Sequence, residues 1–578
     1  MIPRSSPATA IERSPSRQEG TQVMANIRRI APTPNLAQVR EYVLTMLEGL
    51  SSLAESVQDR HTRDRVRDFA DHLVMSWAPK TEALLHQDFG RLDELISAHA
   101  AESPDAPAAV LGERVLSYAQ LEVLVDRLAA ALQRDGLDKG DAIAVCAGAS
   151  LDYIALFLAA SRTGVVIAPL ATWLHLDDIV GLVRDSGARR LFTDHPELAA
   201  KAEVEPVMFA DIEHWMAPPG ARPKPVQVLP GDVHTLMYSS GTTGAPRGVI
   251  QTYQHRWRLL TVVGATHRES YLVSTPLYSA VTNFAWAKPM AVGGTAVLMA
   301  KFDALEFLKL AERWRTTNAV LVPVQCQRIL AHPDFDKFDL SSFRSKVMLS
   351  APSTPELKAE MLRRWPGGLT DIYAMSEGGV ASYLDCAAHP DKLHTVGQPQ
   401  AGVTVKVIDE AGEELGPGAI GELVGRSKTM MQGYHNQPAA TERAFWHDAE
   451  GKAYVRSGDI GRLDTDGFVE LLGRKKDVII SGGQNIYPCD LEAALERHPA
   501  VQDVAVVGRK CARWGEEPVA FVTLNPGWQV DDQTLYDWMG ERLGRQQRPA
   551  AVIILEELPR SPVGKVLKGE LRARLKAA

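Results

Sequence analysis

A loop rich in glycine, serine and threonine is the feature that most constrains this chain of 578 residues. It has the sequence Tyr-Ser-Ser-Gly-Thr-Thr-Gly-Ala-Pro-Arg-Gly-Val over residues 238–249. Glycines lack a Cβ atom, so the backbone turns tightly and presents N–H groups to an anion. Hydroxyl groups add donors, and Arg247 adds a charged, bidentate fork. The residues that we expect to hold phosphate are Ser239, Ser240, Gly241, Thr242, Thr243, Gly244, Arg247 and Gly248.

A flexible surface turn has a similar composition, and taken alone such a loop would be one roughly half the time. Here the loop follows the apolar run Val233–Met237 and precedes Val249 and Ile250, which indicates an ordered connection. No Gly-x4-Gly-Lys-Ser/Thr sequence occurs in the chain, so this is not a P-loop. The sequence therefore predicts a nucleotide-binding loop of a type other than the P-loop.

Composition places the chain among ordinary globular proteins, with 45% hydrophobic and 23% charged residues. Its length exceeds that of one hydrophobic core and predicts at least two domains. The net charge is −8 without a block of like charge, which argues against a nucleic-acid-binding face. The cysteines show neither metal-binding spacing nor a disulfide framework, which favours free thiols in a reducing cytoplasm. They are Cys146, Cys326, Cys386, Cys489 and Cys511.

Residues 1–34 are rich in Ser, Pro and Arg and lack the apolar stretch of a secretory signal. They predict a disordered leader. We expect either Met1 or Met24 to be the first residue of the translated chain. Residues 35–84 have apolar side chains at helical spacing and predict a helical extension. A cap packed on the main domain is favoured over a dimerisation or partner-binding arm, and homodimerisation stays open. No apolar run has the length needed to span a bilayer.

Residues 85–473 alternate short apolar runs with helical stretches, which predicts α/β structure with helix-covered sheets. The runs Ala142–Ala147, Val165–Leu170, Arg190–Thr193, Thr295–Met299 and Ala319–Val324 are the expected buried strands. Alternation near Thr404–Ile408 predicts a small antiparallel β appendage on this large domain. Residues 478–578 predict a small α+β domain that folds as a unit.

Further motifs follow the loop in a fixed order. They are Tyr373-Ala-Met-Ser-Glu377, Ser457-Gly-Asp459, Gly473-Arg-Lys-Lys-Asp477, Gly482-Gly-Gln-Asn-Ile486 and Pro559-Arg-Ser-Pro-Val-Gly-Lys565. With these motifs, the chain resembles the adenylate-forming superfamily over about residues 85–578. This superfamily includes acyl-CoA synthetases, peptide-synthetase adenylation domains and firefly luciferase. The resemblance implies that ATP and Mg²⁺ are used to activate a carboxylic acid.

The resemblance also implies roles for single residues. Tyr373 would stack on adenine, Ser376 would bind phosphate and Glu377 would bind Mg²⁺. Asp459 would accept hydrogen bonds from the ribose hydroxyls, assisted by Arg474. Lys565 would bridge the carboxylate and the α-phosphate. Arg247 stands where the family usually has lysine, which keeps the charge and changes its geometry.

The second half-reaction would use a rotation of the small domain. The resemblance implies a hinge at Lys476 and a pantetheine tunnel beside Gly482 and Gly483. Coenzyme A is the implied acceptor, because the segment Ser481–Pro488 is similar to that of acyl-CoA synthetases. Ser279 stands where the family usually has an aromatic or histidine gate, which weakens an assignment of the acid. Candidate acyl-pocket residues are Tyr278, Ser279, Phe284, Trp286, Ser350, Ala351 and Ala374.

We therefore predict a cytoplasmic ligase that adenylates a fatty, alicyclic or aromatic acid, releases pyrophosphate and transfers the acyl group to coenzyme A. One alternative is an adenylating enzyme that passes the acyl group to a carrier-protein thiol or an amine. Another is a non-catalytic relative that binds nucleotides or acyl ligands; the presence of Glu377, Asp459 and Lys565 argues against it.

Overall fold

The computed structural model describes residues 80–239, 247–261, 269–481, 484–542, 548–561 and 564–577. Two compact units make up the chain, Met1–Gln87 and Asp88–Ala578. Of the first unit only the short helix α4 (Lys80–Leu85) and the two residues after it are described. The expected leader and most of the expected helical extension therefore lie outside the described residues. Within the described part of the chain, no helix has the length and apolar character needed to cross a membrane.

A six-stranded sheet with the order β6-β5-β3-β4-β7-β8 carries the glycine-rich loop. All of its pairings are parallel except that of β7 with β8. Every residue of β3 is buried, as its apolar run predicted. The strands are β3 (Ala142–Cys146), β4 (Val166–Pro169), β5 (Ala188–Thr193), β6 (Glu205–Met208), β7 (Val233–Ser239) and β8 (Arg247–Thr252).

A nine-stranded sheet has the order β15-β14-β13-β12-β11-β9-β10-β1-β2. Parallel pairing runs from β13 through β12, β11, β9 and β10 to β1. Its strands are β1 (Pro107–Leu111), β2 (Arg114–Ser117), β9 (Ser270–Val273), β10 (Thr295–Leu298), β11 (Asn318–Leu321), β12 (Ser345–Leu349), β13 (Gly368–Ala374), β14 (Ala381–Asp385) and β15 (Gln398–Pro399).

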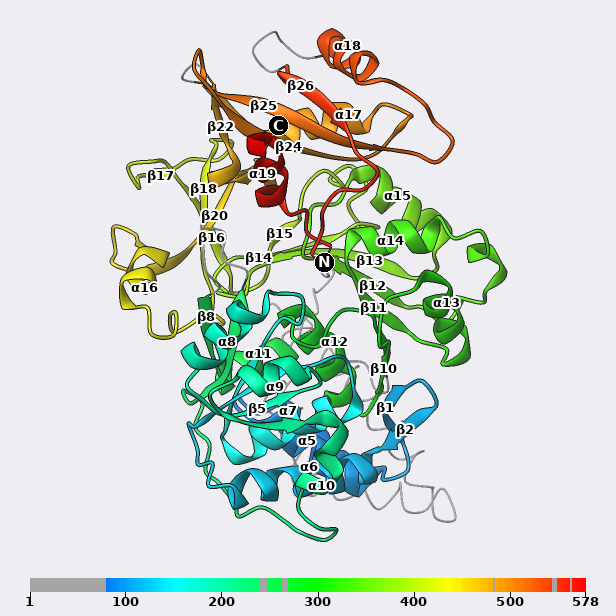
Figure 1. Cartoon of the computed structure of the whole chain (residues 1–578), viewed down its shortest axis with the longest axis vertical. Coiled ribbons are helices and arrows are strands. Elements are labelled where there is room, and N and C mark those ends of the chain that lie inside the picture. The colour runs from blue at the N-terminus through cyan, green and yellow to red at the C-terminus, as the bar shows by residue number, and fades with distance from the viewer. Residues whose placement is uncertain are drawn as a thin grey trace, which may run out of the picture. The chain divides into compact units, whose positions relative to one another are not determined.

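Helices cover both sheets, which confirms the predicted α/β class (Figure 1). Helix α7 begins after Ser150, whose side chain accepts a hydrogen bond from the Tyr153 N–H, and it ends at Gly164 with φ 74°. The helices and 3-10 turns before the appendage are α5 (Leu92–Glu102), α6 (Tyr118–Arg134), α7 (Leu151–Thr163), α8 (Leu176–Asp185), α9 (Pro196–Lys201), η1 (Phe209–Asp211), α10 (Ile212–Trp215), α11 (Tyr253–Thr261), α12 (Ala280–Ala291), α13 (Ala304–Arg313), α14 (Pro323–Leu330), η2 (Phe335–Lys337) and α15 (Pro355–Arg364).

The predicted antiparallel appendage is a further six-stranded sheet. Strands β20 and β21 pair so that Asp459 lies directly opposite Arg474. The elements of the appendage are β16 (Thr404–Ile408), β17 (Glu414–Leu415), β18 (Gly421–Arg426), α16 (Pro438–Ala444), β19 (Phe445–His447), β20 (Ala453–Leu463) and β21 (Val469–Arg474).

Beyond the 3-10 turn η3 (Lys475–Asp477) the chain forms a sheet of its own, with α17 and α18 packed on it through one apolar cluster and α19 through another. Strand β26 joins β25 in parallel, and the other pairings are antiparallel. This α+β arrangement agrees with the predicted fold class. Its elements are β22 (Ile479–Ser481), β23 (Gln484–Ile486), α17 (Pro488–Glu496), β24 (Val501–Cys511), β25 (Gly515–Leu524), α18 (Asp532–Arg542), β26 (Ala551–Ile554) and α19 (Lys568–Ala577).

We predict that Gly397→Ala destabilises the fold by about 3 kcal/mol. Gly397 has φ 85°, and a Cβ atom there would lie 2.0 Å from the carbonyl oxygen of Tyr383. Gly402→Ala is the matched control, because Gly402 has φ 80° with no atom within 4 Å of the added Cβ. Thermal unfolding measures both variants. Equal shifts in melting temperature would mean that the steric contact contributes nothing.

Candidate functional site

The centre of the candidate site is the carboxylate of Asp459, which is 7% exposed. It accepts a hydrogen bond of 2.6 Å from the hydroxyl of Tyr373 at the end of β13. It also forms an ion pair of 2.7 Å with Nε of Arg474, its neighbour across the strand pair β20–β21. Three sequence-predicted residues therefore meet where two sheets come together.

Burial raises the pKa of Asp459, while the charge of Arg474, the Tyr373 hydroxyl and the charge of Lys565 oppose this shift. Burial, together with the adjacent Asp459 carboxylate, raises the pKa of Tyr373 well above its usual value. Tyr373 is thus a neutral hydrogen-bond donor to Asp459. A buried carboxylate with charged and neutral donors around it is suited to accept hydrogen bonds from a sugar diol.

Lys565 reaches this centre from the C-terminal part of the chain. Surrounding protein atoms and the charge of Arg474 lower its pKa, and Asp459 and Glu377 oppose that shift. Its loop is held by a hydrogen bond of 2.8 Å from the N–H of Ser561 to the carbonyl oxygen of Lys565. Gly564 has φ 78°, and a Cβ atom there would lie 2.9 Å from Val324 on α14. The structure therefore brings Lys565 within electrostatic range of the two carboxylates predicted to work with it.

Glu377 and Arg247 are linked by Tyr434, a residue that the sequence analysis did not single out. The Tyr434 hydroxyl donates a hydrogen bond of 3.0 Å to Oε1 of Glu377. The guanidinium carbon of Arg247 lies 5.2 Å from the centre of the Tyr434 ring, a cation–π distance. Tyr434 follows Gly433 in a segment that matches none of the motifs above, so its local sequence does not indicate a functional role. Only the fold shows that it contacts both predicted residues.

The glycine-rich loop joins β7 to β8, and its two ends, Ser239 and Arg247, are paired across these strands. Ser240, Gly241, Thr242, Thr243 and Gly244 lie outside the described residues. The main chain of Ser376 is anchored beside β8, because Nε2 of Gln251 donates to its carbonyl oxygen at 3.1 Å. The described ends of the loop thus place Arg247 beside the segment that carries Ser376 and Glu377.

The predicted hinge residue Lys476 lies in η3, immediately after Arg474. Its neighbour Lys475 forms an ion pair of 2.9 Å with Glu422 in the appendage. On the other side, Asp477 forms an ion pair with Arg572 of α19. The segment therefore contacts elements on both sides of the proposed domain boundary. Gly482 and Gly483 lie outside the described residues.

The acyl-pocket candidates occupy different environments. Ser279 is the N-cap residue of α12, and Phe284 is partly buried. Trp286 is 1% exposed, and its ring packs edge-on against Phe157 at 5.4 Å. The hydroxyl of Tyr278 is buried.

The remaining acyl-pocket candidates lie at the ends of strands. Ser350 and Ala351 follow β12, and Ala374 ends β13 with an exposed side chain. Ser350 has φ 77°, a strained conformation for a residue with a Cβ atom. None of the described contacts joins Ser279, Trp286 and Ser350 into one lining.

The residues present fit Mg²⁺ and a nucleotide. Among the residues that the structure describes, no group of three or more His, Cys, Asp or Glu side chains could hold a metal ion. Mg²⁺ commonly keeps several waters and uses one or two carboxylates together with substrate phosphates. Glu377 and Arg247, which both contact Tyr434, would supply the oxygen ligand and the cation for such an arrangement.

Comparison with known proteins gives consistent matches. The family described as AMP-binding enzyme matches residues 96–435, and that described as AMP-binding enzyme C-terminal domain matches residues 490–565. A feruloyl-CoA synthase of Amycolatopsis sp is 33% identical over 82% of this chain and 97% of that protein. The fatty acid–[acyl-carrier-protein] ligase ScoC of Streptomyces coeruleorubidus is 30% identical over 85% of this chain and 98% of that protein.

A solved structure agrees with these matches. The o-succinylbenzoate CoA synthetase MenE of Bacillus subtilis, in complex with an acyl-adenylate intermediate, has a TM-score of 0.74 at 27% identity. The match covers 84% of this chain and 98% of that protein.

We predict that Tyr434→Phe raises the Mg²⁺ concentration needed for half-maximal pyrophosphate release about 10-fold, because it removes a hydrogen bond to a charged group. Phenylalanine keeps the ring that contacts Arg247. Tyr434→Leu, which also removes the ring, should in addition raise the KM for ATP. Steady-state kinetics with Mg²⁺ and ATP varied separately would show this. An unchanged Mg²⁺ dependence in Tyr434→Phe contradicts the role of the hydroxyl.

Proposed function

Because this chain belongs to the AMP-binding enzyme family, we propose that it is an ATP-dependent acid–thiol ligase that forms an acyl adenylate and then an acyl-CoA. The observation that most supports the proposal is the approach of Lys565 to Asp459 and Glu377. A lysine from the C-terminal part thus interacts electrostatically with the buried Asp459 and the part-buried Glu377, as the proposed use of this loop at the site requires. The proposed setting is the cytoplasm, since the five cysteines are free thiols.

In the first half-reaction, a carboxylate oxygen of the acid attacks the α-phosphorus of ATP. The bond from the α-phosphorus to the bridging oxygen breaks, and pyrophosphate leaves. The attacking and attacked groups are both anionic, so positive charge must lie between them. Lys565 supplies that charge at the α-phosphate, and Arg247 supplies it at the loop. Mg²⁺ beside Glu377 would screen the phosphates.

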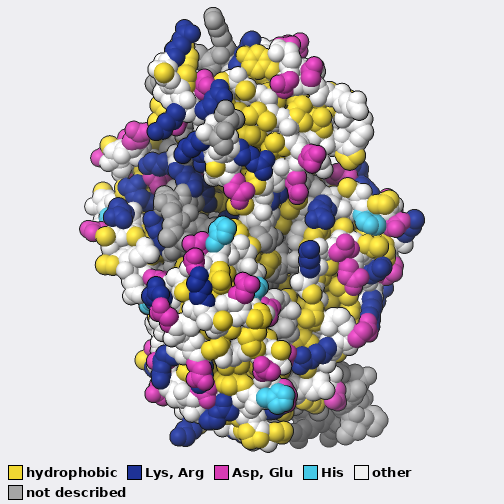
Figure 2. Space-filling view, viewed as in Figure 1, with side chains coloured by type: hydrophobic (Ala, Val, Ile, Leu, Met, Phe, Trp, Pro, Cys, Tyr) yellow, Lys and Arg dark blue, Asp and Glu magenta, His cyan; other side chains and the backbone are white. Residues whose placement is uncertain are grey.

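Asp459, Tyr373 and Arg474 orient the nucleotide in this scheme. The Asp459 carboxylate accepts from the ribose hydroxyls, and the hydrogen bond from Tyr373 fixes the position of that carboxylate. The Tyr373 ring would stack on adenine, as the family resemblance implies. Figure 2 shows Lys and Arg side chains gathered in the upper part of the visible face, where Figure 1 has the appendage and the C-terminal sheet. Such a field favours anionic substrates.

In the second half-reaction, the acceptor thiol attacks the acyl carbon. The bond from that carbon to the phosphate oxygen breaks, AMP leaves, and the thiol proton passes to solvent. We propose that the segment after Arg474 turns at Lys476, so that Lys565 withdraws and the strand pair β22–β23 moves to the acyl group. The proposed domains are 85–473 and 478–578, joined at 474–477.

The acid is proposed to be an uncharged fatty, alicyclic or aromatic carboxylic acid, and coenzyme A is the proposed acceptor. The similarity to a feruloyl-CoA synthase supports an aromatic acid with CoA. The similarity to ScoC supports the second candidate, transfer to a carrier-protein thiol. Pyrophosphate release with a panel of acids, followed by AMP release with CoA, a holo-carrier protein or an amine, tests both. Absence of pyrophosphate release with every acid would contradict the proposal.

We predict that Lys565→Ala slows adenylation by orders of magnitude and leaves thioester formation from a supplied acyl adenylate nearly intact. The charge is needed only while two anions meet. Lys568→Ala is the matched control, because Lys568 is nearby in sequence and pairs with Glu492 at 2.8 Å. Single-turnover assays of each half-reaction measure the effect. Equal loss in both half-reactions would indicate misfolding of the C-terminal part.

We predict that Lys476→Pro separates the two half-reactions in the opposite sense. Proline fixes φ near −65° and removes an N–H, so a residue that must swing through a large backbone change is frozen. Adenylation should largely survive and CoA transfer should collapse, as stopped-flow assays would show. Lys476→Ala removes the side chain and keeps backbone freedom, so it should retain both activities. An unimpaired overall rate in Lys476→Pro would rule out a hinge at this residue.

A further inference from the structure

The strand that leads into the glycine-rich loop is held by a contact between Tyr238 and Asp185. Tyr238 is the last residue of β7 before Ser239, and its hydroxyl donates a hydrogen bond of 2.6 Å to Oδ2 of Asp185. Asp185 is the last residue of α8. Burial, and then the hydrogen bond to Asp185, raise the pKa of Tyr238, so its hydroxyl keeps its proton at neutral pH. Tyr238 is therefore a neutral donor to a carboxylate, which belongs to the stronger class of hydrogen bonds.

The ring of Tyr238 is fixed as well as its hydroxyl. The ring packs against the apolar cluster formed by α8 and strands β3 and β5. It also lies against Gly248, which pairs with Tyr238 across β7 and β8. A Cβ atom on Gly248 would lie 3.2 Å from two carbon atoms of the ring. Tyr238 therefore contacts the strand that leaves the loop as well as the helix that holds its hydroxyl.

The segment after Tyr434 closes this set of contacts into a ring. The N–H of His435 donates to the carbonyl oxygen of Gly248 at 2.8 Å. The next residue, Asn436, donates from Nδ2 to the carbonyl oxygen of Asp185 at 3.2 Å. Asn436 has φ 54°, a left-handed conformation that asparagine adopts more readily than most residues with a Cβ atom. We name this ring of contacts the loop clasp; its members are Asp185, Tyr238, Gly248, His435 and Asn436.

The loop clasp lies directly beside residues of the proposed phosphate site. The two ends of the glycine-rich loop, Ser239 and Arg247, are paired across β7 and β8 next to it. Tyr434, which precedes His435, contacts both Arg247 and Glu377. The clasp thus joins both ends of the loop to the segment that carries Tyr434.

We propose that Asp185 is a positioning residue for ATP, which acts through Tyr238 on the ends of the glycine-rich loop. This inference rests on the proposed function and on the family resemblance, which assigns the β- and γ-phosphates of ATP to that loop. A binding loop whose ends are fixed before the ligand arrives loses less conformational entropy on binding. Asp185 itself touches no substrate in this scheme. Its effect is therefore on the binding of these phosphates and not on that of adenine or ribose.

Binding of two nucleotides to the full chain tests the proposal without knowledge of the acid. Isothermal titration calorimetry with Mg²⁺ compares α,β-methylene-ATP, which is not cleaved at the α-phosphorus, with AMP. Asp185→Ala should raise the Kd of α,β-methylene-ATP about 10-fold, because a hydrogen bond to a charged group is lost. The Kd of AMP should stay unchanged, since AMP lacks the phosphates that the loop would hold.

Tyr238→Phe removes the hydroxyl and keeps the ring that lies against Gly248. Its effect on the Kd of α,β-methylene-ATP should equal that of Asp185→Ala. The double variant should have no larger effect than either single variant, because both substitutions remove the same contact. Losses that add in the double variant would mean two independent effects and would overturn the proposal.

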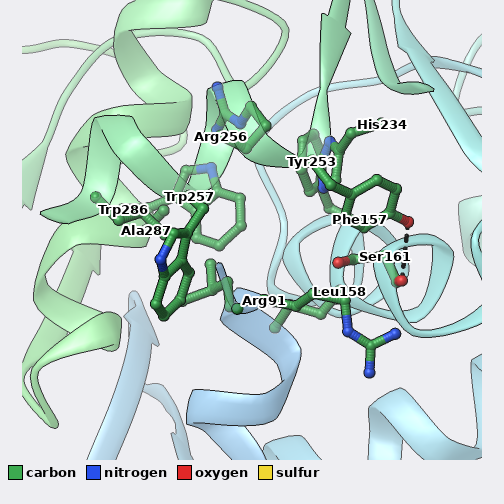
Figure 3. Close-up of a pocket in the computed structure, with 13 residues that line it drawn as sticks. Arg91, Phe157, Leu158, Ser161, His234, Tyr253, Arg256, Trp257, Trp286 and Ala287 are labelled. Carbon is green, nitrogen blue, oxygen red and sulfur yellow. Dashed lines mark hydrogen bonds between the residues drawn. The ribbon is translucent and has the colours of Figure 1, made fainter. Parts of the chain in front are cut away.

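Tyr253→Phe is the matched control in the same region. Tyr253 begins α11 directly after β8, and its hydroxyl donates to the carbonyl oxygen of Ser161 at 2.9 Å, the dashed line in Figure 3. Loss of this hydrogen bond should lower the melting temperature and leave the Kd of both nucleotides as in the wild type. An equally raised Kd of α,β-methylene-ATP in Tyr253→Phe would show that any loss of stability near the loop has this effect, which overturns the proposal.

Failure of this inference and failure of the proposed function give different results. A wild type that binds neither nucleotide contradicts the ligase proposal and the inference with it. A wild type that binds both, together with an unchanged affinity of Asp185→Ala for α,β-methylene-ATP, overturns the inference alone. An equal loss of affinity for both nucleotides in Asp185→Ala would mean a general structural role and would also overturn it.

Discussion

The Asp459 carboxylate and its two partners are the interaction on which the candidate site depends. Asp459 is almost fully buried, and the Tyr373 hydroxyl and the Arg474 guanidinium hold it from two different sheets. Removing one partner of a fully buried charge pair costs roughly 3–5 kcal/mol. Arg474 is 37% exposed, so solvent screening makes its loss less costly than that, yet its pairing still favours one register of β20 and β21. A slip of one residue would turn Arg474 to the opposite face. Strand β21 ends at Arg474, and η3 follows directly. The C-terminal part therefore begins immediately after the residue that pairs with Asp459.

Much of the fold could be predicted from local sequence because buried parallel strands are nearly continuous apolar runs. The expected strand at Ala142–Ala147 is β3, and that at Ala319–Val324 is β11, each within a few residues. The short strands β1, β2 and β6 were not predicted, since their positions depend on pairing with distant segments. The family resemblance implied that Asp459, Arg474 and Lys565 share one site; the structure pairs Asp459 with Arg474, and the charge of Lys565 acts on Asp459. That Tyr373 donates to Asp459 could not be predicted, because a motif gives residue types and no hydrogen-bond directions.

Sequence reasoning missed Tyr434, which contacts Glu377 and Arg247, two residues far away in the chain. Nothing in its local sequence indicates those contacts. The acyl pocket poses the same difficulty, since α12 is apolar on nearly every face and its period does not reveal which side meets a substrate. Trp286 shows this, because its ring packs against Phe157 in the core.

The contacts around the proposed hinge at Lys476 are polar ones that a rotation of the C-terminal part would have to break. Lys475 pairs with Glu422, and the thiol of Cys489 donates to the carbonyl oxygen of Leu472. Both contacts are polar. Lys475 is 46% exposed, and the buried Glu422 keeps its ion pair with Arg456 when Lys475 leaves, so water can replace each contact at a cost of about 1 kcal/mol. The apolar clusters of the C-terminal part lie wholly within it, between its sheet and α17, α18 and α19. Reorientation at Lys476 would therefore exchange weak polar contacts and leave each hydrophobic core intact, which is the balance that two alternating half-reactions at one site demand.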